Sequence, residues 1–371
     1  MWKFDPCVYA VDHEYQIVCC ATDTGIAWVE CGGQIFRDSV GGLMRSESLM
    51  HRISLPMDVL DRAGCYTLCF QSLPERRPYF PQLGAVERAE YSFHPLPATG
   101  AIRAVMLADT HSMIEAPVRA SQSAGTFNLL LLNGDIPAES KRMEDLHAIL
   151  DIASQLTHGS LPIVFARGNH DYRGRLATEL TDYIGTRRGD TFFTFRLGGI
   201  WGIVLDCGED KDDTDIEYGG MVDCHNMRLI ETAYIQSVIE NADHEYDAPD
   251  VTTRIALCHI PFCTETMADE EPKFDIEREL FSEWTKLLNC MKLDIMLCGH
   301  THTIEVIERG SKRARYNANF PIIIGSRPVF PRRGTDESAV FSGIAATING
   351  GDIRIDEISS AHPPIALRYT D

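Results

Sequence analysis

The chain has 371 residues, two to three times the length of a typical domain, which predicts two domains. Hydrophobic residues make up 44% of it and charged residues 24%, proportions that exclude disordered, collagen-like and coiled-coil proteins. Lysine plus arginine number 34 and aspartate plus glutamate 54, so the net charge of −20 repels polyanions. We therefore expect neither nucleic acid nor a membrane as a partner, while the oligomeric state is left open.

The N-terminus and the cysteines indicate in which cellular compartment we expect the protein. The first residues contain no apolar stretch typical of a signal peptide, and no run approaches the roughly 18 apolar residues of a membrane span. We therefore expect a cytoplasmic protein. The twelve cysteines include no pair with C-x-x-C spacing, which argues against a structural zinc module. We expect most of them to be reduced and buried as small hydrophobic side chains.

Residues 1–95 are expected to form an all-β sandwich of the immunoglobulin or fibronectin-III kind. Short runs rich in β-branched and aromatic residues alternate there with clusters of Gly, Pro, Asp and Ser. The expected strands cover residues 15–20, 25–31, 49–55, 65–71 and 89–94.

Residues 96–100 are expected to be a linker, because Pro97 and Gly100 interrupt both helices and strands. From 101 to 371, short apolar runs alternate with helical patterns, which indicates a layered α/β domain. The expected helices cover residues 143–157, 227–241 and 275–291, and a hairpin turn is expected at 349–352.

Five apolar runs of this second domain end in metal-ligating or acid–base residues. The carboxyl ends of strands in an α/β sheet share one edge, where ligands bind, so we expect these residues to converge. Members of a pair two residues apart point the same way in an extended backbone. The residues are Asp109 and His111, Asp135, Asn169 and His170, His259, and His300 and His302.

The donor set indicates a metal centre with two ions. Without His170 it has seven oxygen and nitrogen donors and no thiolate, which suits Mn, Fe or Zn. Seven donors are too many for one tetrahedral ion and suit two ions that share a carboxylate. Gly134, Gly168 and Gly299 are expected to let the backbone turn where the ligands converge.

These motifs, in order Asp-x-His, Gly-Asp, Gly-Asn-His-Asp, His and Gly-His-x-His, resemble those of the calcineurin-like metallophosphoesterase superfamily over roughly residues 102–358. The resemblance implies a four-layer α/β/β/α catalytic domain preceded by the sandwich. By motif position it implies the two groups of ligands as well. Asp109, His111 and His302 hold the first ion, Asn169, His259 and His300 hold the second, and Asp135 bridges them.

Two departures separate the chain from known subfamilies. Purple acid phosphatases carry a tyrosine ligand three residues after the second-motif aspartate, where this chain has Ala138, and they lack the histidine present here as His111. The second motif also lacks the aspartate that pairs with the catalytic histidine in protein Ser/Thr phosphatases, and Glu139 or Asp171 is a candidate replacement. Residues 24–32 nevertheless resemble the sandwich that precedes purple acid phosphatases.

The resemblance implies hydrolysis of a small phosphate ester, either a monoester or a diester. A hydroxide bridging the two ions attacks phosphorus, and His170, assisted by Asp171, acts as general acid. Arg173, Arg175 and Arg327 are candidates to bind the phosphate oxygens. The alternative is a non-catalytic, metal-binding scaffold of the same fold that docks proteins.

The acidic segment 206–223 is the remaining feature of the sequence with two interpretations. It follows an apolar run at 200–205, so it begins at the same sheet edge as the candidate ligands. It forms either a lid over the site or a solvated surface loop. It does not match the calcium-binding pattern of an EF-hand, because no glycine occupies the required position.

Overall fold

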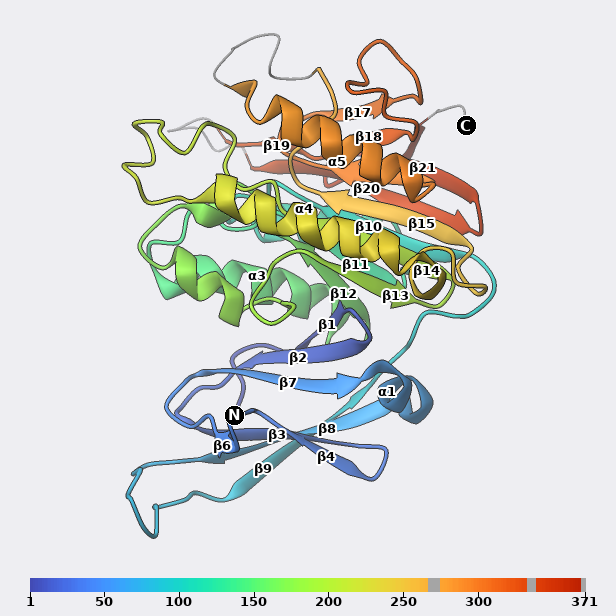
Figure 1. Cartoon of the computed structure of the whole chain (residues 1–371). Coiled ribbons are helices and arrows are strands. Elements are labelled where there is room, and N and C mark those ends of the chain that lie inside the picture. The colour runs from blue at the N-terminus through green and yellow to red at the C-terminus, as the bar shows by residue number, and fades with distance from the viewer. Residues whose placement is uncertain (266–273, 332–337, 368–371) are drawn as a thin grey trace.

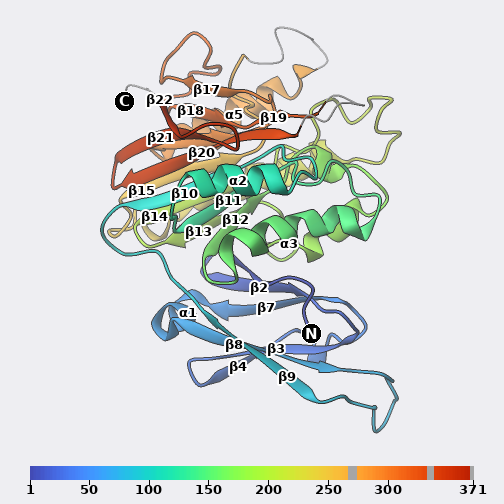
Figure 2. The same ribbon diagram turned by 180° about the vertical axis from the view of Figure 1, so that it is seen from behind.

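The computed structural model describes residues 1–265, 274–331 and 338–367. Within these residues the strands form a ten-stranded, a six-stranded and a four-stranded sheet and one two-stranded hairpin. The two larger sheets stack face to face and carry helices on their outer faces (Figures 1 and 2). The expected α/β/β/α order of layers is therefore confirmed.

The ten-stranded sheet has a parallel centre, in which β10, β11 and β12 pair in parallel and β20 pairs antiparallel to β10. Its order is β22 (Ile365–Leu367), β21 (Asp352–Ser359), β20 (Val340–Asn349), β10 (Ile102–Leu107), β11 (Leu129–Asn133), β12 (Pro162–Ala166), β1 (Cys7–Val11), β2 (Glu14–Cys20) and β7 (Met50–Pro56), with β19 (Arg327–Val329) beside β20.

The six-stranded sheet packs on that centre. Its order is β13 (Phe193–Leu197), β14 (Ile200–Leu205), β15 (Thr253–Cys258), β16 (Ile295–Cys298), β18 (Ile322–Gly325) and β17 (Ile304–Ile307). The strands β14, β15, β16 and β18 are parallel, so their carboxyl ends meet at one edge. Apolar side chains from both sheets, such as Leu131 and Leu257, fill the space between them.

Four helices cover the outer faces. The helices α2 (Glu115–Ser123) and α3 (Met143–Thr157) lie on the ten-stranded sheet, and α4 (Cys224–Glu240) and α5 (Arg278–Cys290) on the six-stranded sheet (Figures 1 and 2). The helix predicted at 143–157 has the predicted bounds, whereas α4 begins three residues earlier than predicted and α5 begins at Arg278.

The N-terminal part contributes a sandwich, as expected. One layer is the four-stranded sheet β4 (Gln34–Arg37), β3 (Gly25–Cys31), β8 (Cys65–Ser72) and β9 (Val86–Ser92). The other layer is the β2–β7 end of the ten-stranded sheet, and α1 (Met57–Ala63) lies against both layers. The hairpin β5 (Ser39–Val40) and β6 (Leu43–Met44) stands beside them, and the short 3₁₀ segments elsewhere are η1 (His170–Tyr172), η2 (Ala177–Asp182) and η3 (Ala242–His244).

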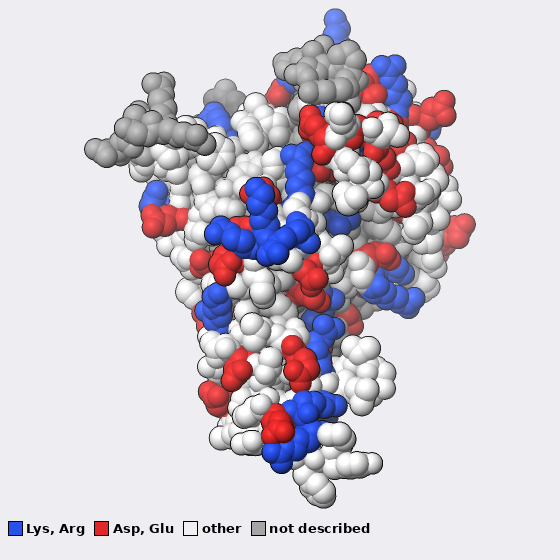
Figure 3. Space-filling model, turned by 90° about the vertical axis from the view of Figure 1, so that its left-hand side faces the viewer, with Lys and Arg blue, Asp and Glu red and all other residues white. Residues whose placement is uncertain are grey.

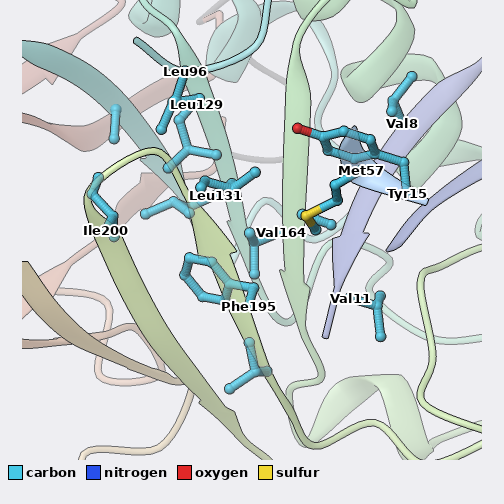
Figure 4. Packing of buried hydrophobic residues seen from close by; sticks show 14 of the residues in the cluster. Val8, Val11, Tyr15, Met57, Leu96, Leu129, Leu131, Val164, Phe195 and Ile200 are labelled. Atoms are coloured by element: carbon cyan, nitrogen blue, oxygen red, sulfur yellow. The ribbon is translucent and has the colours of Figure 1, made fainter. Parts of the chain in front are cut away.

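The sheet does not stop at the predicted linker. The strand β1 pairs in parallel with β12, so residues from both sides of 96–100 share one sheet. Figure 4 shows Tyr15 and Met57 of the N-terminal part in the same packed cluster as Val164 of β12. The physical reason is that all five residues of β1 are buried, so the strand needs neighbours on both faces and both edges. The apolar core is therefore continuous across the predicted boundary at residue 95.

Two further expectations from the sequence concern the cysteines and membrane-spanning segments. Ten of the twelve cysteines are buried and all are free, which confirms that most of them act as small core residues. Among the described residues, no helix has the length and apolarity needed to cross a membrane.

Candidate metal centre

The predicted ligands converge where strands of both large sheets end. Each follows its strand within a few residues, and parallel strands bring those ends to one edge, on the left of Figure 1. The residues are Asp109 and His111 after β10, Asp135 after β11, Asn169 after β12, His259 after β15, and His300 and His302 after β16.

Asp109 lies at the centre of one ligand group. Its Oδ1 atom is 3.5 Å from His302 Nε2, 3.7 Å from His259 Nε2 and 4.0 Å from His111 Nε2. This oxygen is buried and has no hydrogen-bond partner. The other oxygen, Oδ2, accepts hydrogen bonds from the backbone N–H of His300 (2.8 Å) and from the Ser326 hydroxyl. One oxygen is therefore fixed and the other is left open to a cation.

Asp135 connects that group to the rest of the site. Its Oδ2 atom lies 3.3 Å from His259 Nε2 and 3.9 Å from His170 Nε2, and its Oδ1 accepts the backbone N–H of His170 at 2.8 Å. Burial by itself raises the pKa of Asp135, but the positive charge of the nearby His259 outweighs burial and lowers it. Asp135 therefore stays ionised inside the protein.

His259 has a buried ring nitrogen that faces the two carboxylates without forming a hydrogen bond. Its Nδ1–H donates to the backbone carbonyl of Asn133 at 2.6 Å, which directs Nε2 toward Asp109 and Asp135. That Nε2 is buried without a hydrogen-bond partner. Burial lowers the pKa of His259, but the two carboxylates outweigh it and raise the pKa to about 10. Two buried carboxylates thus demand a positive charge, and a metal ion bound to Nε2 fits that demand.

His300 and Asn169 form the remaining pair. His300 Nδ1 lies 2.9 Å from Asn169 Oδ1, so a nitrogen and an oxygen donor face each other. Burial and the neighbouring His259 lower the pKa of His300 to about 4, which keeps its imidazole neutral and suited to a metal. All seven predicted ligands therefore lie in one cluster, and the oxygen and nitrogen donors suit Mn, Fe or Zn.

The backbone at the cluster is strained. Non-glycine residues rarely adopt positive φ, and such residues gather at functional sites. Five of the seven predicted ligands have φ between 44° and 73°, namely Asp109, His111, Asp135, His300 and His302.

The glycines around the ligands are required by close approach. A Cβ on Gly134 would lie 2.6 Å from His259 Nδ1, and the φ of Gly134 is 78°. A Cβ on Gly168 would lie 2.6 Å from the Asp135 backbone nitrogen. Only Gly134 has a positive φ among the three predicted glycines, so Gly168 and Gly299 are needed for space and not for the turn.

His170 lies beside the ligands, and its partners differ from those predicted. Its Nδ1–H donates to the backbone carbonyl of Ala138 at 2.9 Å, and its Nε2 lies 3.0 Å from Arg173 Nη1. Neither predicted acid contacts the imidazole. Glu139 forms an ion pair with Lys141 at 2.6 Å.

Asp171 has a different place from the one predicted. Its Oδ2 accepts the backbone N–H groups of Gly168 (2.8 Å) and Asp135 (3.2 Å), so it joins two ligand loops. Burial and the charge of Asp135 raise the pKa of Asp171 to about 8. The prediction that Asp171 pairs with His170 is wrong, because the turn of η1 directs the two side chains to different partners.

The three candidate arginines lie in different surroundings. Arg173 binds both carboxylate oxygens of Glu209, at 3.0 and 2.8 Å, as well as His170. Arg175 is exposed, and its Nε donates to a backbone carbonyl at 2.8 Å. Arg327 pairs with Glu357 on β21. Only Arg173 therefore touches a predicted site residue.

The acidic segment 206–223 has a buried start and a largely exposed remainder. Asp206, Glu209 and Lys211 at its start are buried, whereas most of the later residues are exposed. The buried part forms a wall of the site, because Glu209 holds Arg173.

Ser326 is the residue that the sequence did not reveal. It is fully buried and directly follows β18, and its hydroxyl fixes Asp109. The available signal was its place after another parallel strand of the same sheet.

Comparison with known proteins agrees with this geometry. The family model described as calcineurin-like phosphoesterase matches residues 102–303, more than half of the chain. The chain belongs to the calcineurin-like phosphoesterase family. A search of curated proteins found no match.

Two solved structures share the fold of this calcineurin-like phosphoesterase. Purple acid phosphatase PPD1 from yellow lupin (Lupinus luteus) seeds has a TM-score of 0.60 at 13% identity, over 97% of this chain and 72% of the other. PhoD has a TM-score of 0.52 at 10% identity, over 100% of this chain and 94% of the other. The first alignment includes the sandwich as well as the catalytic layers, since it covers nearly the whole chain.

Proposed function

We propose that this chain is a phosphoesterase that hydrolyses a small phosphate ester with two bound ions of Mn, Fe or Zn. One observation carries the proposal. Asp109 Oδ1 and His259 Nε2 are buried, have no hydrogen-bond partner and lie 3.7 Å apart beside the ionised Asp135. Such a cluster needs cationic charge, and the family to which the chain belongs is one of phosphoesterases.

The residues divide between the ions as the motifs imply. When bound, two such ions supply Lewis acidity, which neutralises charge on the phosphoryl oxygens and acidifies water. Asp109, His111 and His302 would hold one ion, Asn169, His259 and His300 the other, and Asp135 both.

His170 is the proposed general acid. The Ala138 carbonyl orients its ring, so that Nε2 lies 3.9 Å from Asp135 Oδ2, at the edge of the ligand cluster. In the structure Nε2 accepts a hydrogen bond from Arg173, so the role of acid requires Nε2 to exchange this bond for a proton. This proton then passes to the leaving oxygen of the ester, a contribution of about 10²–10⁴-fold in rate. Arg173, which contacts His170, is the arginine that we propose to bind the phosphate.

The test is metal titration followed by a hydrolysis assay. We expect the full chain to bind about two ions and to hydrolyse bis-p-nitrophenyl phosphate only when loaded. His259→Ala is the inactive control, because it removes a predicted ligand. Binding of the ions without hydrolysis of any ester would instead favour the non-catalytic scaffold.

A further inference from the structure

A groove of about 810 Å³ opens beside the candidate site, and the mechanism above leaves it without a role. Residues 172–178 form one wall, and residues 217–224 with the start of α4 form the other. Its volume lies within the range of pockets that bind small molecules.

The groove is continuous with the general acid through Arg173. This side chain lines the groove, and its Nη1 lies 3.0 Å from His170 Nε2. A general acid must stand next to the oxygen that leaves. The alcohol that departs on the side of His170 therefore enters the groove, an argument that rests on the proposed function.

The walls of the groove are largely apolar. Tyr172, Tyr218, Met221 and Met227 all line it. Met221 is 87% exposed, so a large apolar side chain is left uncovered at the rim. These side chains suit an apolar body of the ligand, aliphatic or aromatic, because methionine adapts its shape to what it contacts.

Among the cations that line the groove, Arg175 is the one without an ion pair in the described residues. Arg173 is paired with Glu209 and Arg167 with Asp206. Of the other carboxylates of the groove, Glu217 pairs with Lys211 at 3.0 Å and Asp223, on the opposite wall from Arg175, accepts a hydrogen bond from Asn226. Figure 3 shows Lys and Arg side chains gathered near the middle of this face. An exposed guanidinium without a carboxylate partner favours an anionic group on the ligand.

We propose that this groove binds the leaving alcohol of the ester, and that this alcohol has an apolar or aromatic body with an anionic group placed to meet Arg175. In the reaction, water adds its oxygen to phosphorus and the P–O bond to the alcohol breaks. The alcohol oxygen takes a proton, so ester plus water yields phosphate and the free alcohol. The substrate class is thus an ester of an amphiphilic, anionic alcohol.

The proposed contact between Arg175 and an anionic group of the alcohol is tested with two aryl esters. Their leaving phenols have similar acidity. The full chain, loaded with Mn²⁺, is assayed on phenyl phosphate and 4-(carboxymethyl)phenyl phosphate, each as monoester and as methyl diester. We expect kcat/KM to be about tenfold higher for the carboxylated ester, the size of one charge-assisted hydrogen bond. In Arg175→Gln this ratio should fall to about one, whereas Arg62→Gln, an exposed arginine on α1, should keep it.

Each outcome has one meaning. A ratio near one in the unmodified protein, or an unchanged ratio in Arg175→Gln, overturns the groove proposal. Failure to hydrolyse any of the esters after loading with Mn²⁺, and likewise with Fe²⁺ or Zn²⁺, overturns the proposed function itself. Product inhibition by 4-hydroxyphenylacetate gives a second measurement, because it should weaken in Arg175→Gln relative to inhibition by phenol.

The proposed contact between the apolar body of the alcohol and the groove wall is tested by substituting Met221. In Met221→Ser, the preference for phenyl phosphate over glycerol 2-phosphate, expressed as the ratio of 1/KM values, should fall about fivefold, which is the effect of removing partial apolar contact. Met143→Ser is the matched control, since Met143 is an exposed methionine on α3. Equal changes in KM for both esters would show that Met221 does not contact the alcohol.

Discussion

Among single residues, Asp135 is the carboxylate that connects the two groups of ligands. One of its oxygens faces His259 and His170, and the other accepts the backbone N–H that follows Asn169. Its position between the two ligand groups is what a carboxylate shared by two cations requires. The charge on this side chain, and not its size, should therefore determine how many ions the site holds.

Asp135→Asn keeps the shape and removes the charge. We expect the variant to bind about one ion or fewer where the unmodified protein binds about two, and to lose most of its activity. Elemental analysis of the purified protein measures the ions. Asp58→Asn, at an exposed aspartate on α1, is the control. Retention of both ions in Asp135→Asn would show that Asp135 is not shared.

His170→Ala separates a general acid from a ligand. We expect the variant to keep its ions, because His170 Nδ1 is already bound to Ala138 and the motif assigns it no ion. Its rate should fall about 10²-fold more on an alkyl phosphate than on a p-nitrophenyl ester, since a poor leaving group needs the proton more. His259→Ala should lose metal and lose rate on both esters alike. Loss of metal from His170→Ala would contradict the role of acid.

At the scale of elements, a buried ion pair joins the end of β12 to the end of β14. Arg167 Nε lies 2.6 Å from Asp206 Oδ2, and the Arg167 guanidinium stacks on the Tyr172 ring, 3.8 Å from its centroid. Thr191 also donates to Asp206. This pair holds the loop of Asn169 and His170 against the second sheet, so the two halves of the site keep their spacing.

Asp206→Asn should therefore destabilise the protein more than a surface change does. We expect a loss of about 3–5 kcal/mol in the free energy of unfolding, because the buried Arg167 charge loses its partner. Urea denaturation of the metal-free protein measures it. The exposed pair of Asp58 and Arg62 provides the control, since Asp58→Asn should change stability little. A similar effect of both variants would mean that water reaches Arg167.

For the whole molecule, the main consequence concerns the shared sheet. The N-terminal part supplies β1, β2 and β7 to the same sheet whose centre carries Asp109, Asp135 and Asn169. One apolar core runs from the sandwich into the space between the two large sheets (Figure 4). Stability of the candidate site should therefore depend on residues far from it in the sequence.

A chain that begins at Ala101 tests this dependence. Its β12 would become an exposed edge strand with an apolar face that β1 and β2 normally continue, which favours aggregation. We expect the truncated protein to elute as aggregates in size-exclusion chromatography, while the full chain elutes in a defined peak. A well-behaved truncated protein would show that the second part folds by itself, as the boundary at 95 predicts.

The sequence by itself determined which candidate residues meet at one edge of the sheets, and the layered architecture. Each candidate ligand follows a local apolar run, and the rule that parallel strands end at one edge then requires Asp109, Asp135 and His259 to meet. The helix at 143–157 could be predicted to the residue, because its apolar periodicity is a local property.

Only the tertiary structure decided which groups complete the site. The Asn133 carbonyl that orients His259 is 126 residues away in the chain, and Ser326 is 217 residues from Asp109. Local patterns carry no information on such distant contacts. The parallel pairing of β1 with β12 was hidden for the same reason, since strand partners are chosen by packing across the whole core.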